Sequence, residues 1–296
     1  MDFDIKIISI NDKNFPRELR LIKTPPKVLY YSGRLPSENE ICLAIVGSRI
    51  PSLYGRQVCS EIGSDVAMSS ATIVSGLAKG IDSLAHECAV RINKRTIAVL
   101  GSGIDKESFY PKENLRLAQE MLNNDGLIIS EYPPGYKSTR YSFPERNRII
   151  AGLSKAVIVI EAKEKSGSLI TANIAKLQKK KVFAVPNSIY SPNSRGCNEL
   201  IKNGAKLVTC GNDIFESLKE NDLPLIYKDD KKIGVKGDND NERKLLEILE
   251  KSQSPLGIEK LIKLSKMSPA DAISTITILE IKNKIIDIKD RNYSIK

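Results

Sequence analysis

Six apolar runs along the chain each end in a loop of small residues, and each loop is followed by a helix-like pattern. Runs of valine and isoleucine without polar alternation are typical of strands that are buried on both faces. Regular alternation of such strands with helices predicts the α/β class, with a parallel sheet and right-handed crossovers. The runs with their loops are AIVGSR (44–49), TIVSGLAKGID (72–82), TIAVLGSGID (96–105), LIISEYPPG (127–135), AVIVIEAKEKSGS (156–168) and VFAVPNS (182–188).

The helical segments between these runs show the 3.6-residue period of helices that pack on a sheet. Helices are predicted over 54–68, where Val58, Ile62 and Val66 form a stripe, and over 79–91. Residues 1–40 form a lead-in segment in which KVLYYSG (27–33) predicts a short strand and turn. We therefore expect one large domain over residues 1–218.

The pattern changes after residue 218, which predicts a second and smaller domain. Residues 219–240 are charged and aperiodic, so they are predicted to be a linker. Residues 241–296 predict three helices, the third capped by Ser268 with Pro269 at its first position, and then a hairpin turning at 290–292. Three helices and a hairpin predict a winged helix-turn-helix.

The loops after the parallel strands should meet at one sheet edge, where open α/β sheets bind ligands. GSR (47–49), SGLAKGID (75–82) and SGSLITA (166–172) combine glycine, hydroxyls and cations at helix starts, a chemistry that suits phosphate. Asp82 is expected to shape its turn rather than to act in catalysis. Each loop alone is a weak signal, because small-residue turns are common.

The stretch SFPERNRIIAGLS (142–154) is the least ordinary part of the sequence. It is either a capped helix with solvated arginines or part of the ligand edge, where Arg146 and Arg148 would hold phosphates and Phe143 would stack on a base. Arg140, just before this stretch, adds another cation to it. Glu161, at the end of its strand, is expected to pair with Arg146 or Arg148 rather than to act as a base.

Several classes of site are excluded or disfavoured. GSGID (101–105) lacks the third glycine of a dinucleotide fingerprint, because Lys106 stands there, and no P-loop sequence occurs. We find no Ser-His-Asp set and no paired metal ligands, and His86 is expected to be a packed histidine. No cofactor or metal is therefore expected.

The amino-acid composition indicates which kind of partner the protein binds and in which compartment of the cell it works. The net charge of +10 and the isoelectric point near 9.2 favour a polyanionic partner, although a lysine-rich composition would also produce them. The five cysteines form no CxxC pair and are expected to be buried, reduced thiols in a cytoplasmic protein. No secretory signal and no membrane span are expected.

Together these motifs resemble the DNA-processing protein A (DprA, or Smf) family, in the same order and spacing from about residue 8 to about residue 218. FPERNRIIAGLS and SGSLITA are the most specific of them. The resemblance implies an extended Rossmann-like domain that binds single-stranded DNA. It also implies a homodimer that loads the recombinase RecA onto incoming strands in natural transformation, without turnover chemistry.

The resemblance also implies which residues hold the strand. Phosphate contacts are expected from the first loop, the second loop, the arginine helix and the last loop, and base contacts from Phe143 and Arg140. The implied site consists of Gly47, Ser48, Arg49, Ser75, Gly76, Lys79, Gly80, Arg140, Phe143, Arg146, Arg148, Ser166, Gly167, Ser168 and Thr171.

Two features refine this expectation. The third helix of the small domain, SPADAISTITILEI, carries no lysine or arginine, so this domain is expected to contact protein or to regulate rather than to read DNA. The alternative function is that of a nucleoside monophosphate phosphoribohydrolase of the lysine decarboxylase-like group. That group resembles this chain in fold, but its PGGxGTxxE sequence is replaced here by EAKEKSGSLITA (161–172).

Overall fold

The computed structural model describes residues 3–218, 237–252, 255–282, 284–289 and 292–295. The chain divides into two compact units, Met1–Ile226 and Tyr227–Lys296. Most of the predicted linker, residues 219–236, lies outside the described residues, as do positions 290 and 291 of the predicted hairpin turn.

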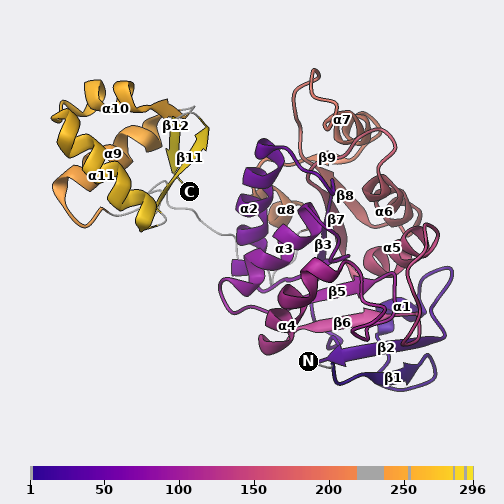
Figure 1. Ribbon diagram of the computed structural model, residues 1–296. Helices are drawn as coiled ribbons and strands as arrows, with labels where there is room; N and C mark the ends of the chain where they lie inside the picture. Colours follow the sequence, from indigo (N-terminus) through magenta and orange to yellow (C-terminus); the bar gives the residue numbers. More distant parts are fainter. Residues whose placement is uncertain (1–2, 219–236, 253–254, 283, 290–291, 296) are drawn as a thin grey trace. The chain divides into compact units, whose positions relative to one another are not determined.

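A nine-stranded sheet forms the centre of the first unit (Figure 1), in the order β1-β2-β6-β5-β4-β3-β7-β8-β9. The six predicted strands are all present and run parallel, and β9 extends the parallel part. KVLYYSG supplies β2, which pairs antiparallel with β6 and with β1. The strands are β1 (Lys6–Ser9), β2 (Val28–Gly33), β3 (Cys42–Val46), β4 (Thr72–Ser75), β5 (Thr96–Leu100), β6 (Leu127–Ser130), β7 (Ala156–Val159), β8 (Lys181–Ala184) and β9 (Lys206–Leu207).

Helices cover both faces of this sheet (Figure 1). One face carries α2 (Leu53–Met68), α3 (Ile81–Val90), α4 (Leu115–Asn123) and α8 (Gly211–Leu218), with η1 (Lys112–Asn114) beside α4. The other face carries α1 (Arg17–Arg20), α5 (Ser142–Leu153), α6 (Gly167–Leu177) and α7 (Arg195–Lys202). Among the described residues, no helix has both the length and the apolar character that a membrane span needs.

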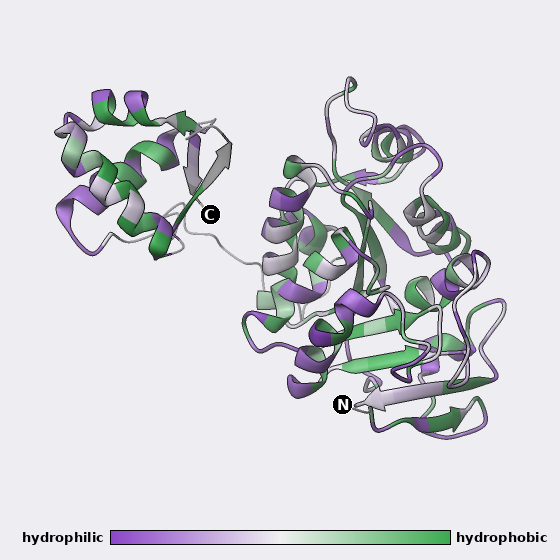
Figure 2. Cartoon of the chain, viewed as in Figure 1, coloured by the Kyte–Doolittle hydropathy of each residue, from purple (hydrophilic) through white to green (hydrophobic). Residues whose placement is uncertain are grey.

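The strands are apolar throughout because both of their faces are covered. In β3, Ala44 and Val46 pack in the core under α5 and α6, while Leu43 and Ile45 pack in the core under α2 and α3. Figure 2 shows the resulting green centre of the first unit. The expectation of free thiols holds, since Cys42, Cys59, Cys88 and Cys197 are buried and Cys210 is half-buried.

The second unit has its own core and its own small sheet. Its helices are α9 (Asp240–Lys251), α10 (Ile258–Ser265) and α11 (Pro269–Ile281), and its strands are β10 (Leu256–Gly257), β11 (Ile285–Lys289) and β12 (Asn292–Ile295), in the antiparallel order β10-β12-β11. Ser268 caps α11 as predicted, because its hydroxyl accepts the Asp271 N–H at 3.1 Å. The expected helices and hairpin strands are present, and the winged-helix assignment itself stays a prediction.

His86 is a core residue, as the sequence predicts. It is fully buried on α3, and its Nδ1 lies 2.7 Å from the Thr96 hydroxyl of β5. Burial, together with the charge of Arg146, lowers the pKa of His86 to about 3. The folded protein therefore holds this imidazole neutral throughout the pH range in which an ordinary histidine titrates.

This buried histidine should make stability depend on pH in a defined window. Between pH 7.5 and 5.5 the unfolded chain takes up a proton on His86, whose ordinary pKa is 6.5, while the folded chain does not. Stability present above pH 6.5 is thus lost as the pH falls, by about 1.4 kcal/mol over this interval. Urea unfolding of the wild type at both pH values measures this loss.

His86→Gln is the control, because His86 is the single histidine of the chain. The variant can be less stable at both pH values, but its difference between pH 7.5 and 5.5 should vanish. A variant that keeps the full wild-type pH dependence contradicts the assignment.

Candidate functional site

The strand order reverses between β3 and β7, and a cavity lies at this reversal. β3 pairs with β4 on one side and with β7 on the other, so the chain leaves β3 and β7 toward opposite faces of the sheet. Such a reversal leaves a crevice at the carboxyl ends of the strands. A cavity of about 600 Å³ occupies it. Its lining comes from the loop after β3, from Ala78 and Asp82 around the start of α3, from Arg140 and the helix α5 that follows it, and from the first turn of α6 with the loop before it.

The loop after β3 is shaped by close packing. A Cβ atom on Gly47 would lie 2.7 Å from the Ile81 side chain, so only glycine fits this turn. Gly80, at φ +86°, packs against the same loop, where a Cβ would lie 2.4 Å from the Ser48 carbonyl oxygen. The Ser48 hydroxyl accepts the Ile50 N–H, and Arg49 is exposed at the cavity. Gly80 therefore supports the loop from behind.

The helix α5 turns one face toward the cavity. Phe143, Arg146, Asn147 and Ile150 follow the helical period and all line it. The Arg49 guanidinium stacks over the Phe143 ring, 4.9 Å from its centroid. The ring of Tyr110 packs against Phe143 from another side, with 5.7 Å between the centroids. Arg49 and Phe143 thus form a cationic and aromatic wall of the cavity.

Arg146 is a buried charge beneath the cavity. Its guanidinium donates to the Gly76 carbonyl at 2.7 Å and to the Val99 carbonyl, at the ends of β4 and β5. Burial lowers the pKa of Arg146 to about 10, against the opposing effect of Asp82. Burial raises the pKa of Asp82, against the charge of Arg146, and Asp82 accepts the Gly76 N–H. Asp82 thus shapes its turn, as predicted, and Arg146 stays charged at neutral pH.

The start of α6 presents three hydroxyls, those of Ser166, Ser168 and Thr171, to the cavity. Ser166 caps the helix by accepting the Ser168 N–H, and the two hydroxyls lie 2.7 Å apart. Thr171 completes the set one turn later. The amide of Asn147 donates to the Gly167 carbonyl at 3.2 Å, which fixes α5 against this helix start. An eleven-residue helix favours an anion at such an end.

The cavity brings together most of the predicted site and leaves some of it outside. The predicted residues that line it are Gly47, Ser48, Arg49, Arg140, Phe143, Arg146, Ser166, Gly167, Ser168 and Thr171. The predicted residues outside the lining are Ser75, Gly76, Lys79, Gly80 and Arg148.

The predicted residues outside the lining make contacts of their own in this structure, and their part in binding stays a prediction. Ser75 donates to the Ile45 carbonyl at 2.6 Å inside the sheet. Lys79 lies on the surface, 2.6 Å from Glu113. Arg148 pairs with Glu131 at 2.7 Å. Gly76 admits Arg146, since a Cβ there would lie 2.5 Å from its guanidinium.

The expected ion pair of Glu161 with Arg146 or Arg148 is wrong. Glu161 is fully buried, and its carboxylate accepts the Ser52 N–H at 2.8 Å and the Ser52 hydroxyl at 2.6 Å. It thereby sits at the amino end of α2, whose partial positive charge stabilises a carboxylate. It lies on the α2 side of the sheet, whereas both arginines belong to α5 on the other side.

Sequence reasoning did not single out the lysines at this site. Lys163 and Lys165 line the cavity beside Ser166, and both are exposed. Both lysines lie within the loop EAKEKSGS (161–168), where the predicted anion site rested on the glycine and the hydroxyls. With them, the lining carries five cations, namely Arg49, Arg140, Arg146, Lys163 and Lys165, and the one carboxylate Asp82. The cavity is therefore suited to an anion with several charges.

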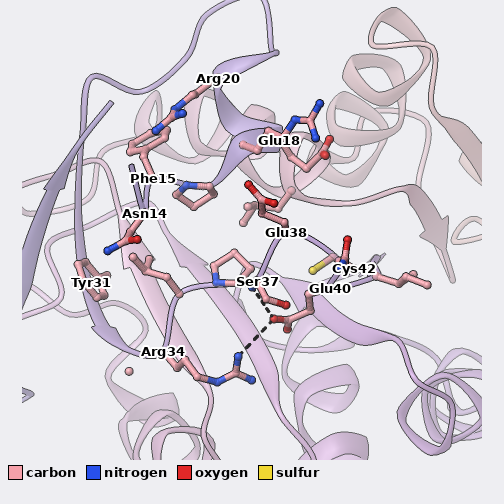
Figure 3. A pocket seen from close by; sticks show the side chains of 18 of the residues that line it. Asn14, Phe15, Glu18, Arg20, Tyr31, Arg34, Ser37, Glu38, Glu40 and Cys42 are labelled. Carbon is pink, nitrogen blue, oxygen red and sulfur yellow. Dashed lines mark hydrogen bonds and ion pairs between the residues drawn. The ribbon is translucent and has the colours of Figure 1, made fainter. Parts of the chain in front are cut away.

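A second cavity, of about 920 Å³, lies at the opposite edge of the sheet, where β3 begins (Figure 3). Its central carboxylate, Glu40, accepts the Ser37 N–H and pairs with Arg34 and Arg95. None of the predicted site residues lines it. Because this cavity lies at the amino ends of the parallel strands, away from the edge where open α/β sheets bind ligands, the cavity between β3 and β7 is the better candidate. No group of three potential metal-ligating residues comes together in the described part of the chain.

Comparison with known proteins gives a consistent picture for the first unit. Residues 6–219 match the profile of the family described as DNA recombination-mediator protein A. The chain is 42% identical over 220 residues to DNA processing protein DprA of Bacillus subtilis, a match that covers 74% of this chain and 73% of that protein. It is 46% identical over 217 residues to Protein Smf of Synechocystis, covering 72% of this chain. That match spans only 54% of the Synechocystis protein.

Solved structures agree with this comparison. DNA processing protein A from Streptococcus pneumoniae superimposes with a TM-score of 0.67 at 45% identity, over 72% of this chain and 74% of that one. DNA processing protein A from Helicobacter pylori superimposes with a TM-score of 0.64 at 32% identity, over 74% and 98%. The Helicobacter structure is described as giving insight into a unique single-stranded DNA binding mode of that protein.

Glu161→Gln should test the capping role of this carboxylate. The amide replaces one acceptor with a donor beside the Ser52 N–H and hydroxyl, which leaves a buried group unsatisfied and should cost about 1–3 kcal/mol of unfolding free energy. Hydrogen exchange should increase at the first turn of α2. Glu131→Ala, which breaks the half-exposed pair with Arg148, should cost less than about 1 kcal/mol. Equal costs in the two variants contradict the capping role.

Proposed function

The chain belongs to the DNA recombination-mediator protein A family, and from this we propose that its first unit binds single-stranded DNA at the cavity between β3 and β7. The observation that carries the proposal is the lining itself, with five cations against one carboxylate around the stack of the exposed Arg49 guanidinium on the half-buried Phe143 ring. The Helicobacter pylori protein, whose described binding mode is for single-stranded DNA, supports the same ligand.

Phosphates would be held by charge and by oriented N–H groups. Arg49, Lys163 and Lys165 are exposed at the cavity and free to reach a passing backbone. The start of α6 adds hydroxyls and helix N–H groups at the same point. Binding through phosphates does not depend on base sequence, and its affinity falls as the salt concentration rises.

A base would be held by stacking. Phe143 is half-buried and offers an aromatic face, and Arg49 already stacks on it in the free protein. Aromatic stacking tolerates any base, because every base has a π-face. Duplex DNA hides its base faces, so this wall favours an unpaired strand.

The oligomeric state and the role of the protein in the cell are proposed from its family membership. We propose that the protein is a homodimer, that it protects incoming single strands, and that it loads RecA onto them in natural transformation. The support is the family description as a recombination mediator and the DprA names of the relatives. The match ends at residue 219, so the second unit takes no role from it.

We propose no turnover chemistry at this site. Asp82 is the one carboxylate in the lining, and it is buried against Gly76 N–H and Arg146. Glu161, the other carboxylate near the end of β7, caps α2. Neither is placed as a free acid or base, which disfavours the phosphoribohydrolase alternative.

Arg49→Ala should weaken binding to every single-stranded sequence. Because one phosphate contact is lost, the slope of log affinity against log salt should become shallower by about 0.7. Fluorescence anisotropy with labelled oligonucleotides of several sequences, titrated over salt, measures both effects.

Lys79→Ala is the matched control, since Lys79 is a nearby cation that pairs with Glu113 outside the cavity. It should leave the slope unchanged. An Arg49→Ala protein with wild-type affinity and slope would remove Arg49 from the site, and a Lys79→Ala protein with the larger effect would move the site away from the cavity.

Deletion of residues 240–296 should leave affinity for duplex DNA unchanged. The third helix of the second unit has no lysine or arginine between Pro269 and Ile281, so it lacks the side chains that contact phosphates and base edges. Binding of the same duplex to the full chain and to the shortened chain gives the comparison. A measurable loss of duplex affinity on deletion argues for a DNA-reading second unit.

A further inference from the structure

A small cavity at the amino ends of β8 and β9 is lined by four lysines. It has a volume of about 280 Å³ and lies at the opposite edge of the sheet from the cavity between β3 and β7. Among the described residues, no carboxylate lines it, and no carboxylate forms an ion pair with its lysines. We call it the lysine cavity, after Lys176 at the end of α6, Lys180 and Lys181 at the start of β8, and Lys206 in β9.

Three of these lysines also cap the carboxyl ends of helices. Lys180 donates to a carbonyl in the last turn of α5 at 2.8 Å, and Lys176 donates to the carbonyl that ends α7 at 2.9 Å. Lys181 donates to a carbonyl near the end of α8. A helix end carries about half a negative charge, so three ends leave roughly 2.5 of the four positive charges without compensation. Capping therefore explains where these side chains lie and leaves an excess of positive charge.

Two lysines show this excess directly. Lys206 is exposed, and it has no hydrogen-bond or ion-pair partner in the part of the chain that the structure describes. Burial lowers the pKa of Lys180 to about 8, against the smaller opposing effect of Glu18. An anion in the cavity would stabilise the charged form of both. The volume lies below the roughly 300–1,000 Å³ of ordinary ligand pockets, so it suits one phosphate group better than a whole nucleotide.

The helix α6 connects the lysine cavity with the cavity between β3 and β7. Its first residues, Gly167 and Ser168, line the cavity between β3 and β7, and Lys176, one residue before its end, lines the lysine cavity. Eleven helical residues span about 16 Å. Neighbouring nucleotides of a stacked strand are about 3.4 Å apart, so about five of them cover this distance.

We propose that the lysine cavity binds a second phosphate of the same DNA strand, which runs along α6 from the cavity between β3 and β7. This inference rests on the proposed function, because it extends the path of a strand that is bound at the first cavity. It gives one copy of the chain two phosphate contacts separated by the length of a helix.

The exposed side of α6 is compatible with such a path. The helix contains no carboxylate, and its one charged residue is Lys176. Ile170 is 40% exposed and Leu177 is 84% exposed, with the exposed Asn173 between them. At 100° per residue these three positions fall within an arc of about 60°. Exposed apolar side chains in a row often mark a binding groove, and sugars and bases can cover them while the phosphates reach the lysines.

Strand length separates the two contacts in an experiment on the full chain. Oligothymidylates of three and of twelve nucleotides are the probes, the longer measured by fluorescence anisotropy and the shorter by competition against it. For the longer strand, Lys176→Ala combined with Lys206→Ala should make the slope of log affinity against log salt shallower by about 1.4, because two cations lose their phosphates. The shorter strand cannot reach both cavities, so its affinity and slope should stay at the wild-type values.

Two further variants serve as controls. Lys94→Ala combined with Lys202→Ala removes two exposed lysines outside both cavities, at the same cost in net charge, and should keep the wild-type slope. Lys206→Ala alone removes no described hydrogen bond, so it isolates the charge from the capping role of Lys176. It should make the slope for the longer strand shallower by about 0.7.

The outcomes separate this inference from the proposed function. A lysine-cavity variant that binds the longer strand with the slope of the control overturns the inference, whereas an effect of Arg49→Ala on that strand keeps the proposed function. Equal losses for both strand lengths also overturn the inference, because they place the lysines at the first contact. A wild-type protein that binds neither strand overturns the proposed function, and this inference with it.

Discussion

The first unit is organised around one buried charge, the guanidinium of Arg146. Removing an arginine from water costs several kcal/mol unless its donors find partners. Here the Gly76 and Val99 carbonyls both accept from one terminal nitrogen and Asp82 lies close by, while the buried Nε has no hydrogen-bond partner among the described residues. The arrangement ties α5 to the ends of β4 and β5, and it requires a glycine at 76. The remaining cavity side of α5, including Phe143, takes its position from this anchor.

The amino ends of α2 and α6, which both lie near the cavity, differ in the groups that face them. The amino end of α2 is closed by the protein's own carboxylate, since Glu161 accepts from Ser52. The amino end of α6 carries neutral hydroxyls, and Lys163 and Lys165 stand beside it. One anion position is therefore filled from within the chain, and the other is open to a ligand. This asymmetry explains why Glu161, although near the site, is no part of its binding chemistry.

The sequence was sufficient for seven of the nine strands, β1 and β9 being missed, and for ten residues that line the cavity, because these depend on local pattern. Apolar runs identify buried strands, and parallel strands bring their following loops to one edge. The failures concern individual partners. Arg146 and Arg148 were treated alike, yet residues two apart on a helix point about 200° apart, so one is buried and the other meets Glu131. The partner of Glu161 comes from a residue more than a hundred positions away, which no local pattern reveals.

The size of the cavity limits how much of a DNA strand one copy of the chain could hold on the proposed function. About 600 Å³ accommodates a ligand of the size of a nucleotide with its neighbouring phosphates, and not a long strand. On the proposed function, one cavity then contributes a few contacts, and firm binding of a strand depends on several copies acting together.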